Sequence, residues 1–209
     1  MNTPSKYTSL IPTLGIGLFI CLYIYATRLY PGGSQANENS IGFSWVHNYW
    51  CNLMNEQSIN GQHNPARPIA ISAMSVLCFS LMLFFIQFSQ VFTKSLMWKR
   101  IISLGGIGSM LCALFIFTSY HDLMTSLSSI FGLFVVIGIL KEIYQQSKPF
   151  YKISGLACLL LLGLNNFIYY SGIYLYMLPL LQKITFAIVL FYIVGLNLKI
   201  HQEIKNNNI

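Results

Sequence analysis

Six long runs of apolar residues constrain the fold of this chain more than any other feature. Each is long enough to cross the hydrocarbon core of a bilayer, which takes roughly 20 helical residues. Lipid offers no hydrogen-bond partners, so a crossing segment must pair its own backbone groups as a helix. The runs predict an all-α fold, a polytopic six-helix transmembrane bundle forming a single domain over residues 1–209. The expected spans are 7–26, 68–92, 101–118, 123–140, 153–170 and 178–198.

The charged residues are few, and they lie mostly between the apolar runs. Only 8% of the residues are Asp, Glu, Lys or Arg, whereas soluble domains carry about 25%. The net charge of +7 does not indicate nucleic-acid binding, because the Lys and Arg residues are scattered among apolar segments. We therefore expect these cations to set the orientation in a membrane.

The distribution of charge between alternate connecting segments predicts the orientation. If the N-terminus is cytoplasmic, the inner segments hold nine Lys or Arg and two Glu, and the outer segments hold three residues of each sign. Positive residues accumulate on the cytoplasmic side of membrane proteins, so both termini are expected there. A bacterial inner membrane is the expected setting, because the chain is compact and has no Asn-x-Ser/Thr glycosylation signal.

The first outer loop, residues 31–67, is the longest connection and contains a candidate amphipathic helix over residues 42–55. At about 100° per residue, one side of such a helix would be apolar and aromatic and the other polar. The apolar side would hold Phe43, Val46, Trp50, Leu53 and Met54, and the polar side Ser44, His47, Asn48, Cys51, Asn52 and Asn55. Such a helix is too short to span, so we expect it to lie in the interface and cover the bundle.

Polar residues gather on the predicted outer face. Polar groups at membrane depth are costly in lipid and therefore tend to face a bundle interior. The sequence thus predicts an outward-facing polar pocket that binds a lipid or small amphiphile. Its candidate residues are His47, Asn48, Asn52, His121, Asp122 and Lys183. Asn166 and its neighbour Asn165 are expected near the same level.

Other interpretations of these residues stay open. His47, His121 and Asp122 have the ligand types of a zinc site, where an open position would activate water for hydrolysis of lipid esters or amides. The spacing argues against this alternative, since the chain contains neither HxxxH nor HExxH. The histidines could instead hydrogen-bond within the bundle, Asp122 could cap a helix, and Lys183 could extend to the interface.

The sequence leaves open whether the protein is an enzyme. It contains no GxSxG elbow and no Walker loop, and no pair of acids lies in mid-span as in many proton-driven carriers. A third hypothesis is a structural role, in which the loop helix binds another membrane protein or a second copy of the chain.

Several strings in the first loop resemble a known group of proteins. They are Tyr30-Pro31-Gly32-Gly33-Ser34, Gly42-Phe43-Ser44-Trp45, His47 to Leu53, Asn60-Gly61 and Asn64. The chain resembles uncharacterised small bacterial six-span membrane proteins, broadly similar to the Frag/DRAM/Sfk-like group. That resemblance implies six helices and a lipid-related role, and it transfers no catalytic residues. Alkaline ceramidase-like hydrolases are a second comparison, but this chain lacks their HxxxH pair and a seventh span.

Overall fold

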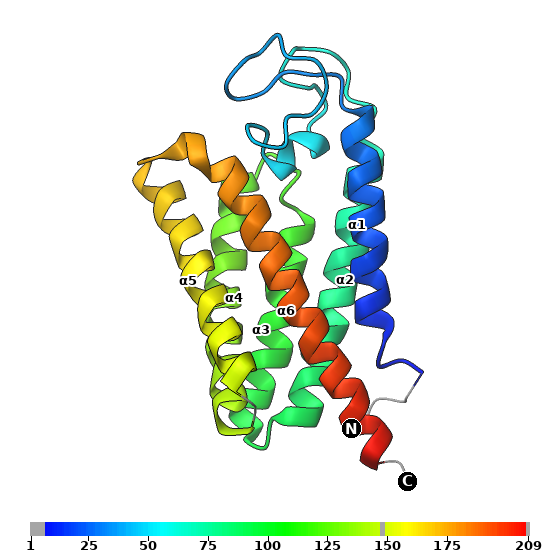
Figure 1. Cartoon of the computed structure of the whole chain (residues 1–209), viewed down its shortest axis with the longest axis vertical. Coiled ribbons are helices and arrows are strands. Elements are labelled where there is room, and N and C mark those ends of the chain that lie inside the picture. The colour runs from blue at the N-terminus through cyan, green and yellow to red at the C-terminus, as the bar shows by residue number, and fades with distance from the viewer. Residues whose placement is uncertain (1–6, 147–148, 208–209) are drawn as a thin grey trace.

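The computed structural model describes residues 7–146 and 149–207, and its ordered elements are helical (Figure 1). The six α-helices are α1 (Ile11–Leu29), α2 (Arg67–Phe92), α3 (Leu96–Leu114), α4 (His121–Gln146), α5 (Pro149–Ser171) and α6 (Leu178–Asn207). Two short 3₁₀ helices, η1 (Trp50–Met54) and η2 (Leu175–Met177), lie in the connections at the end opposite the C-terminus. The predicted all-α fold is confirmed.

Five of these helices, all except α3, are long and apolar enough to cross a membrane. The first turn of α3 contains Lys99 and Arg100, so only a short uncharged stretch remains before the helix ends at Leu114. The expected span continued to residue 118, but residues 115–120 form turns instead. At their C-terminal ends, α4 and α6 extend past the expected limits of residues 140 and 198, to Gln146 and Asn207. A helix can continue with polar residues beyond the apolar segment that would cross a membrane. Two of the nine Lys and Arg residues assigned to the inner segments, Lys6 and Lys148, lie outside the residues that the structure describes.

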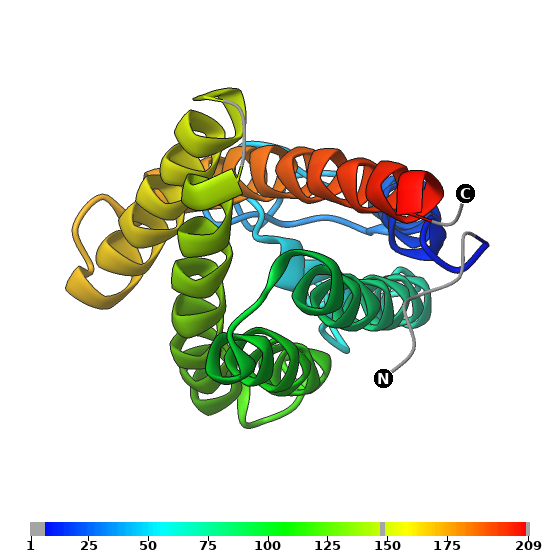
Figure 2. The same cartoon turned by 90° about the horizontal axis from the view of Figure 1, so that it is seen from below.

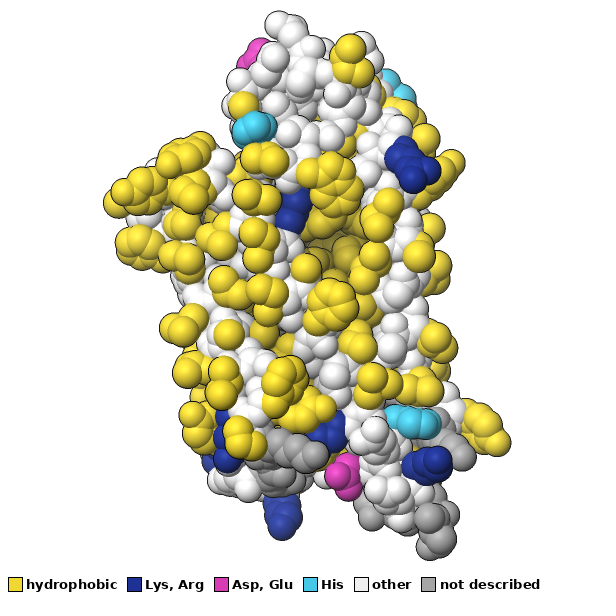
Figure 3. Space-filling model, viewed as in Figure 1, with side chains coloured by type: hydrophobic (Ala, Val, Ile, Leu, Met, Phe, Trp, Pro, Cys, Tyr) yellow, Lys and Arg dark blue, Asp and Glu magenta, His cyan; other side chains and the backbone are white. Residues whose placement is uncertain are grey.

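The helices form a bundle in which α2 to α6 surround a central region and α1 lies outside it against α2 (Figure 2). α3 packs closely on both α2 and α4, whereas α4 contacts α5 only loosely. After α5, the chain returns through α6, which also contacts α1 and α2. Hydrophobic side chains cover the middle of the face in Figure 3, while charged and histidine side chains lie toward its two ends.

Small residues on α3 permit its close packing. A Cβ atom on Gly106 would lie 2.4 Å from the ring of Phe85 on α2, and one on Gly105 would lie 3.0 Å from Val135 on α4. Because lipid is as apolar as these side chains, helix association in a membrane depends on such close van der Waals contact. The glycines therefore hold α2, α3 and α4 together as one closely packed unit.

A buried polar network joins the N-terminal end of α1 to the C-terminal ends of α2 and α6, at the end of the bundle predicted to be cytoplasmic. The Thr13 hydroxyl donates to the Asn197 side-chain oxygen at 2.7 Å, and the Asn197 amide donates to Gln87 at 3.3 Å. The hydroxyl of Ser9 lies 2.6 Å from Nδ1 of His201. Interhelical hydrogen bonds of this kind fix which helices are neighbours, and here they join the first helix to the last.

The first loop does not contain the predicted amphipathic helix. Residues 42–49 form turns and irregular backbone, and only the five residues of η1 are helical. The loop folds back on itself through isolated bridges that pair residue 32 with 41 and residue 57 with 63. Gly33 has φ +83°, and a Cβ there would lie 2.4 Å from the backbone nitrogen of Asn60. Glycine at this position permits a compact loop. Contacts within that loop outweigh the helical pattern of residues 42–55.

Candidate functional site

A cavity of about 780 Å³ lies among α2, α3, α4, α5 and α6. Its wall is almost entirely apolar, with Leu77, Leu81, Leu133, Leu159 and Leu162 among the side chains that contribute to it. The volume falls within the range of roughly 300–1,000 Å³ typical of ligand pockets. The cavity is only partly enclosed, so a ligand has a route into it.

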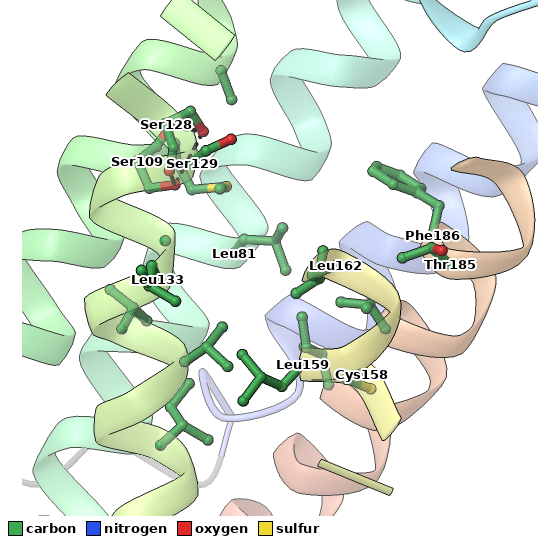
Figure 4. Close-up of a pocket in the computed structure, with 18 of the residues that line it drawn as sticks. Leu81, Ser109, Ser128, Ser129, Leu133, Cys158, Leu159, Leu162, Thr185 and Phe186 are labelled. Atoms are coloured by element: carbon green, nitrogen blue, oxygen red, sulfur yellow. Dashed lines mark hydrogen bonds between the residues drawn. The ribbon is translucent and has the colours of Figure 1, made fainter. Parts of the chain in front are cut away.

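The polar side chains of the cavity wall are concentrated at one end. They lie close to the C-terminal ends of α3 and α5 and the N-terminal ends of α4 and α6, at the end of the bundle predicted to face outward. We call this set the polar end; it consists of Ser109, Ser126, Ser128, Ser129, Asn166, Tyr170 and Thr185. Figure 4 shows Ser109, Ser128 and Ser129 together, with Thr185 and Phe186 on the opposite wall.

Some groups of the polar end already pair with one another. The Ser109 hydroxyl donates to the carbonyl of Ser128 at 2.9 Å, and the Ser128 hydroxyl donates to the carbonyl of Ser109 at 3.0 Å. The Asn166 amide donates to its own helix, at the carbonyl of Leu162, which leaves the side-chain oxygen of Asn166 as an acceptor. Within the part of the chain that the structure describes, the Ser129 hydroxyl forms no hydrogen bond. Asn166 and Ser129 are therefore the groups best able to accept a ligand.

Two tyrosines of α5 bridge to α4 at the outer rim of the cavity. The Tyr169 hydroxyl donates to Asp122 at 2.8 Å, and the Tyr170 hydroxyl lies 2.9 Å from the Ser126 hydroxyl. Nδ1 of His121 lies 3.0 Å from the same carboxylate oxygen of Asp122. Asp122 sits inside the first turn of α4 rather than capping it, and there its charge is favoured by the helix dipole. His121 and Asp122, both candidate site residues, are thus hydrogen-bonded to each other; His121 is partly exposed and Asp122 is exposed.

Lys183 belongs to a different cluster. Its side chain is 8% exposed, and its ammonium donates to the main-chain carbonyls of Asn48 and Pro179. The ammonium also lies 5.5 Å from the ring centre of Phe43 and 5.6 Å from that of Trp50. Carbonyl dipoles and aromatic faces stabilise a buried cation. Among the described residues, no carboxylate pairs with Lys183, so these groups take the place of a counter-ion.

The side chains of Asn48 and Asn52 form hydrogen bonds with the backbone of the first loop. The Asn48 side chain is fully buried, donates to Gly33 O and accepts from Ser44 N, both at 2.8 Å. The Asn52 side chain accepts from the backbone nitrogen of Tyr49 at 2.7 Å. The expectation that both amides lie on the polar side of a helix over residues 42–55 is wrong, because that segment is largely not helical and both side chains bond to loop backbone instead.

His47 is exposed, and its Nδ1 lies 3.3 Å from the Ser44 hydroxyl. Within the described ranges, no three His, Cys, Asp or Glu side chains are placed to hold a metal ion. The structure therefore brings His121 and Asp122 together without a third ligand from His47. A zinc site at His47, His121 and Asp122 stays a prediction for metal analysis to test.

Three ionisable side chains in and beside the first loop, those of Tyr30, Tyr49 and Cys51, are partly shielded from water. Burial raises the pKa of the Cys51 thiol, although nearby backbone N–H groups and the charge of Lys183 partly offset the effect. Burial also raises the pKa values of Tyr30 and Tyr49. The thiol and the two phenol groups thus lie where water is partly excluded.

The sequence predicts a polar pocket rather than an apolar cavity among the helices, and it does not single out Ser129 or Tyr170 as part of a site. A signal was present, because residues 125–129 place four hydroxyl side chains in five positions of an otherwise apolar run. Hydroxyl residues in transmembrane helices also serve helix packing, as Ser109 and Ser128 do. The signal therefore does not identify a site without knowledge of which way each side chain points.

The chain was also compared with known proteins. No protein-family model, no curated protein and no solved structure matches it. The resemblance to the six-span group stays a prediction, and the function is argued from the site itself.

Proposed function

We propose that this protein is a six-span integral membrane protein that binds the hydrocarbon chain of a membrane lipid or small amphiphile in its central cavity. The observation that carries the proposal is the size of the apolar cavity, about 780 Å³ among α2 to α6. In this proposal α3 crosses the membrane with the other five helices, and both termini are cytoplasmic. The excess of positive charge on the inner connecting segments supports that orientation.

The cavity is lined by apolar side chains except at the polar end, so water is a poor occupant of most of it. A hydrocarbon chain from the surrounding bilayer restores the missing van der Waals contacts.

The test uses two glycines with matched surroundings. Gly163 on α5 lines the cavity, whereas Gly17 on α1 does not, and a Cβ at either position would meet no atom within 4 Å. Replacing Gly163 by Phe places a ring in or against the cavity, while Gly17→Phe adds the same ring on an exposed position outside it. Both changes remove a helical glycine, so their effects on helix propensity are comparable.

Lipid retained by protein purified in mild detergent is measured by native mass spectrometry. We expect the unaltered protein and Gly17→Phe to retain about one lipid or amphiphile per chain, and Gly163→Phe to lose most of it. Equal retention in the two variants would contradict the cavity as the binding site. Absence of bound lipid from the unaltered protein, both in detergent and in nanodiscs, would contradict the function.

A further inference from the structure

The cavity is polar at one end only. All of its hydroxyl and amide groups except Tyr192 belong to the polar end defined above, near the outer surface. Tyr192, farther along α6, donates its hydroxyl to the carbonyl of Tyr151. Toward the cytoplasmic side, the wall consists of residues such as Leu81, Phe84, Ile139 and Leu196. A ligand with one polar and one apolar end therefore has one preferred direction in the cavity.

The polar end carries no formal charge. No Asp, Glu, Lys, Arg or His is among the residues that line the cavity in the described part of the chain. Inside a membrane, a phosphate without a paired cation would be costly to bury. Asp122 lies at the rim, where its main-chain carbonyl accepts a hydrogen bond from the cavity-lining Ser126. Its carboxylate would repel an anionic head.

The groups available to a ligand suit hydroxyls. A hydroxyl both donates and accepts hydrogen bonds. It could donate to the side-chain oxygen of Asn166 and accept from the Ser129 hydroxyl, which has no partner in the described structure. The pair formed by Ser126 and Tyr170 adds two further hydroxyls at the rim. An alcohol satisfies these groups without bringing in a charge.

We infer that the cavity selects a lipid with an uncharged, hydroxyl-bearing head, of which a monoacylglycerol is the simplest example. The glycerol hydroxyls contact Ser129 and Asn166, and the acyl chain extends along the apolar wall toward the cytoplasmic side. This inference rests on the proposed function, since it assigns the head group of a lipid whose chain occupies the same cavity.

The experiment compares two lipids that differ only in a phosphate. The protein is placed in phosphatidylcholine nanodiscs and titrated with 1-oleoylglycerol or with 1-oleoylglycerol 3-phosphate, and bound lipid is measured by native mass spectrometry. We expect about tenfold tighter binding of the uncharged lipid, equivalent to about 1.4 kcal/mol. Ser129→Ala and Asn166→Leu, made singly, should each reduce that preference severalfold.

Ser72→Ala is the matched control. Ser72 also lies near the outer end of its helix, but its hydroxyl donates to Pro68 of the same helix and it does not line the cavity. The control should keep the full preference, and thermal unfolding identifies any variant that fails to fold. Ser129→Ala removes a single oxygen atom, so it keeps the test valid if Asn166→Leu does not fold.

The outcomes separate this inference from the proposed function. Equal binding of the two lipids, or tighter binding of the phosphate, would overturn the head-group assignment, even where Gly163→Phe still abolishes binding of both. An unchanged preference in Ser129→Ala and Asn166→Leu would overturn it as well. If Gly163→Phe left the binding of both lipids intact, the proposed function would fail and this inference with it.

Discussion

The ammonium of Lys183 donates a hydrogen bond to the main-chain carbonyl of Asn48, joining α6 to the first loop across 135 positions of sequence. Asn48 in turn holds Gly33 and Ser44 through its side chain. A cation that the sequence places among candidate ligand-binding groups thus supports the loop that covers the bundle.

Replacement of Lys183 by Met should loosen the first loop. The variant keeps most of the side-chain volume but loses two hydrogen bonds and the contacts with two aromatic rings. Hydrogen bonds of charged groups contribute about 1.5–3 kcal/mol. Cleavage by a Glu-specific protease at Glu38 and Glu56, both exposed in the loop, should therefore become faster. Lys205→Met, at an exposed position in the last turn of α6, is the control, and equal cleavage rates in the two variants would count against the prediction.

Asn48→Asp should lower the melting temperature despite its near-identical shape. The change removes the amide that donates to Gly33 O and places a carboxylate oxygen against that carbonyl. Leaving a buried polar group unpaired costs about 1–3 kcal/mol. Asn55→Asp, at an exposed position of the same loop, should have little effect. A melting temperature as high for Asn48→Asp as for the control would show that the Asn48 contact contributes little.

Gly106→Ala should destabilise the bundle. The added Cβ would lie 2.4–2.6 Å from three atoms of Phe85, a side chain packed between α2 and α3. Overpacking of this kind costs about 1–3 kcal/mol. Gly17→Ala, which meets no neighbouring atom, should be neutral or slightly stabilising because alanine favours helices. Thermal unfolding in detergent checks both, and a neutral Gly106→Ala would contradict close packing at this position.

The raised pKa of Cys51 predicts a loss of stability at alkaline pH. Folding favours the neutral thiol, so this contribution is fully present below the ordinary thiol pKa, about 8.5, and is lost as the pH rises through the raised value. The melting temperature should fall as the pH rises above the ordinary thiol pKa, and fall less in Cys51→Ala. Cys112→Ala is the control. An identical pH profile for Cys51→Ala and the unaltered protein would contradict this assignment.

Metal analysis tests the hydrolase alternative. Because the described residues offer no third ligand beside His121 and Asp122, we expect protein purified without chelator to hold well under one equivalent of zinc. His121→Ala should leave that content unchanged. About one equivalent of zinc, lost in His121→Ala, would instead support metal-dependent hydrolysis and call for assays with lipid esters and amides.

The positions of the helices were largely predictable from local sequence. A long uncharged run such as residues 68–92 has few alternatives to a helix, and α2 occupies Arg67–Phe92. Charged residues mark where an apolar run ends. In α3, Lys99 and Arg100 leave only a short uncharged stretch before the helix ends at Leu114. Among the candidate site residues, His121 and Asp122 are hydrogen-bonded to each other, and as neighbours in sequence they lie close together whatever the tertiary fold.

The remaining features depended on tertiary structure. The burial of Asn48 arises from the path of an irregular loop, where glycine backbone conformations and distant carbonyls matter more than a helical period. Three of the groups around the Lys183 ammonium, on Phe43, Asn48 and Trp50, come from a segment more than a hundred residues away, so no local pattern contains them. The cavity depends on how the helices tilt and rotate and on the loose packing of α4 against α5. Hydropathy determines which segments become helices in lipid, but only side-chain packing decides where those helices leave space for a ligand.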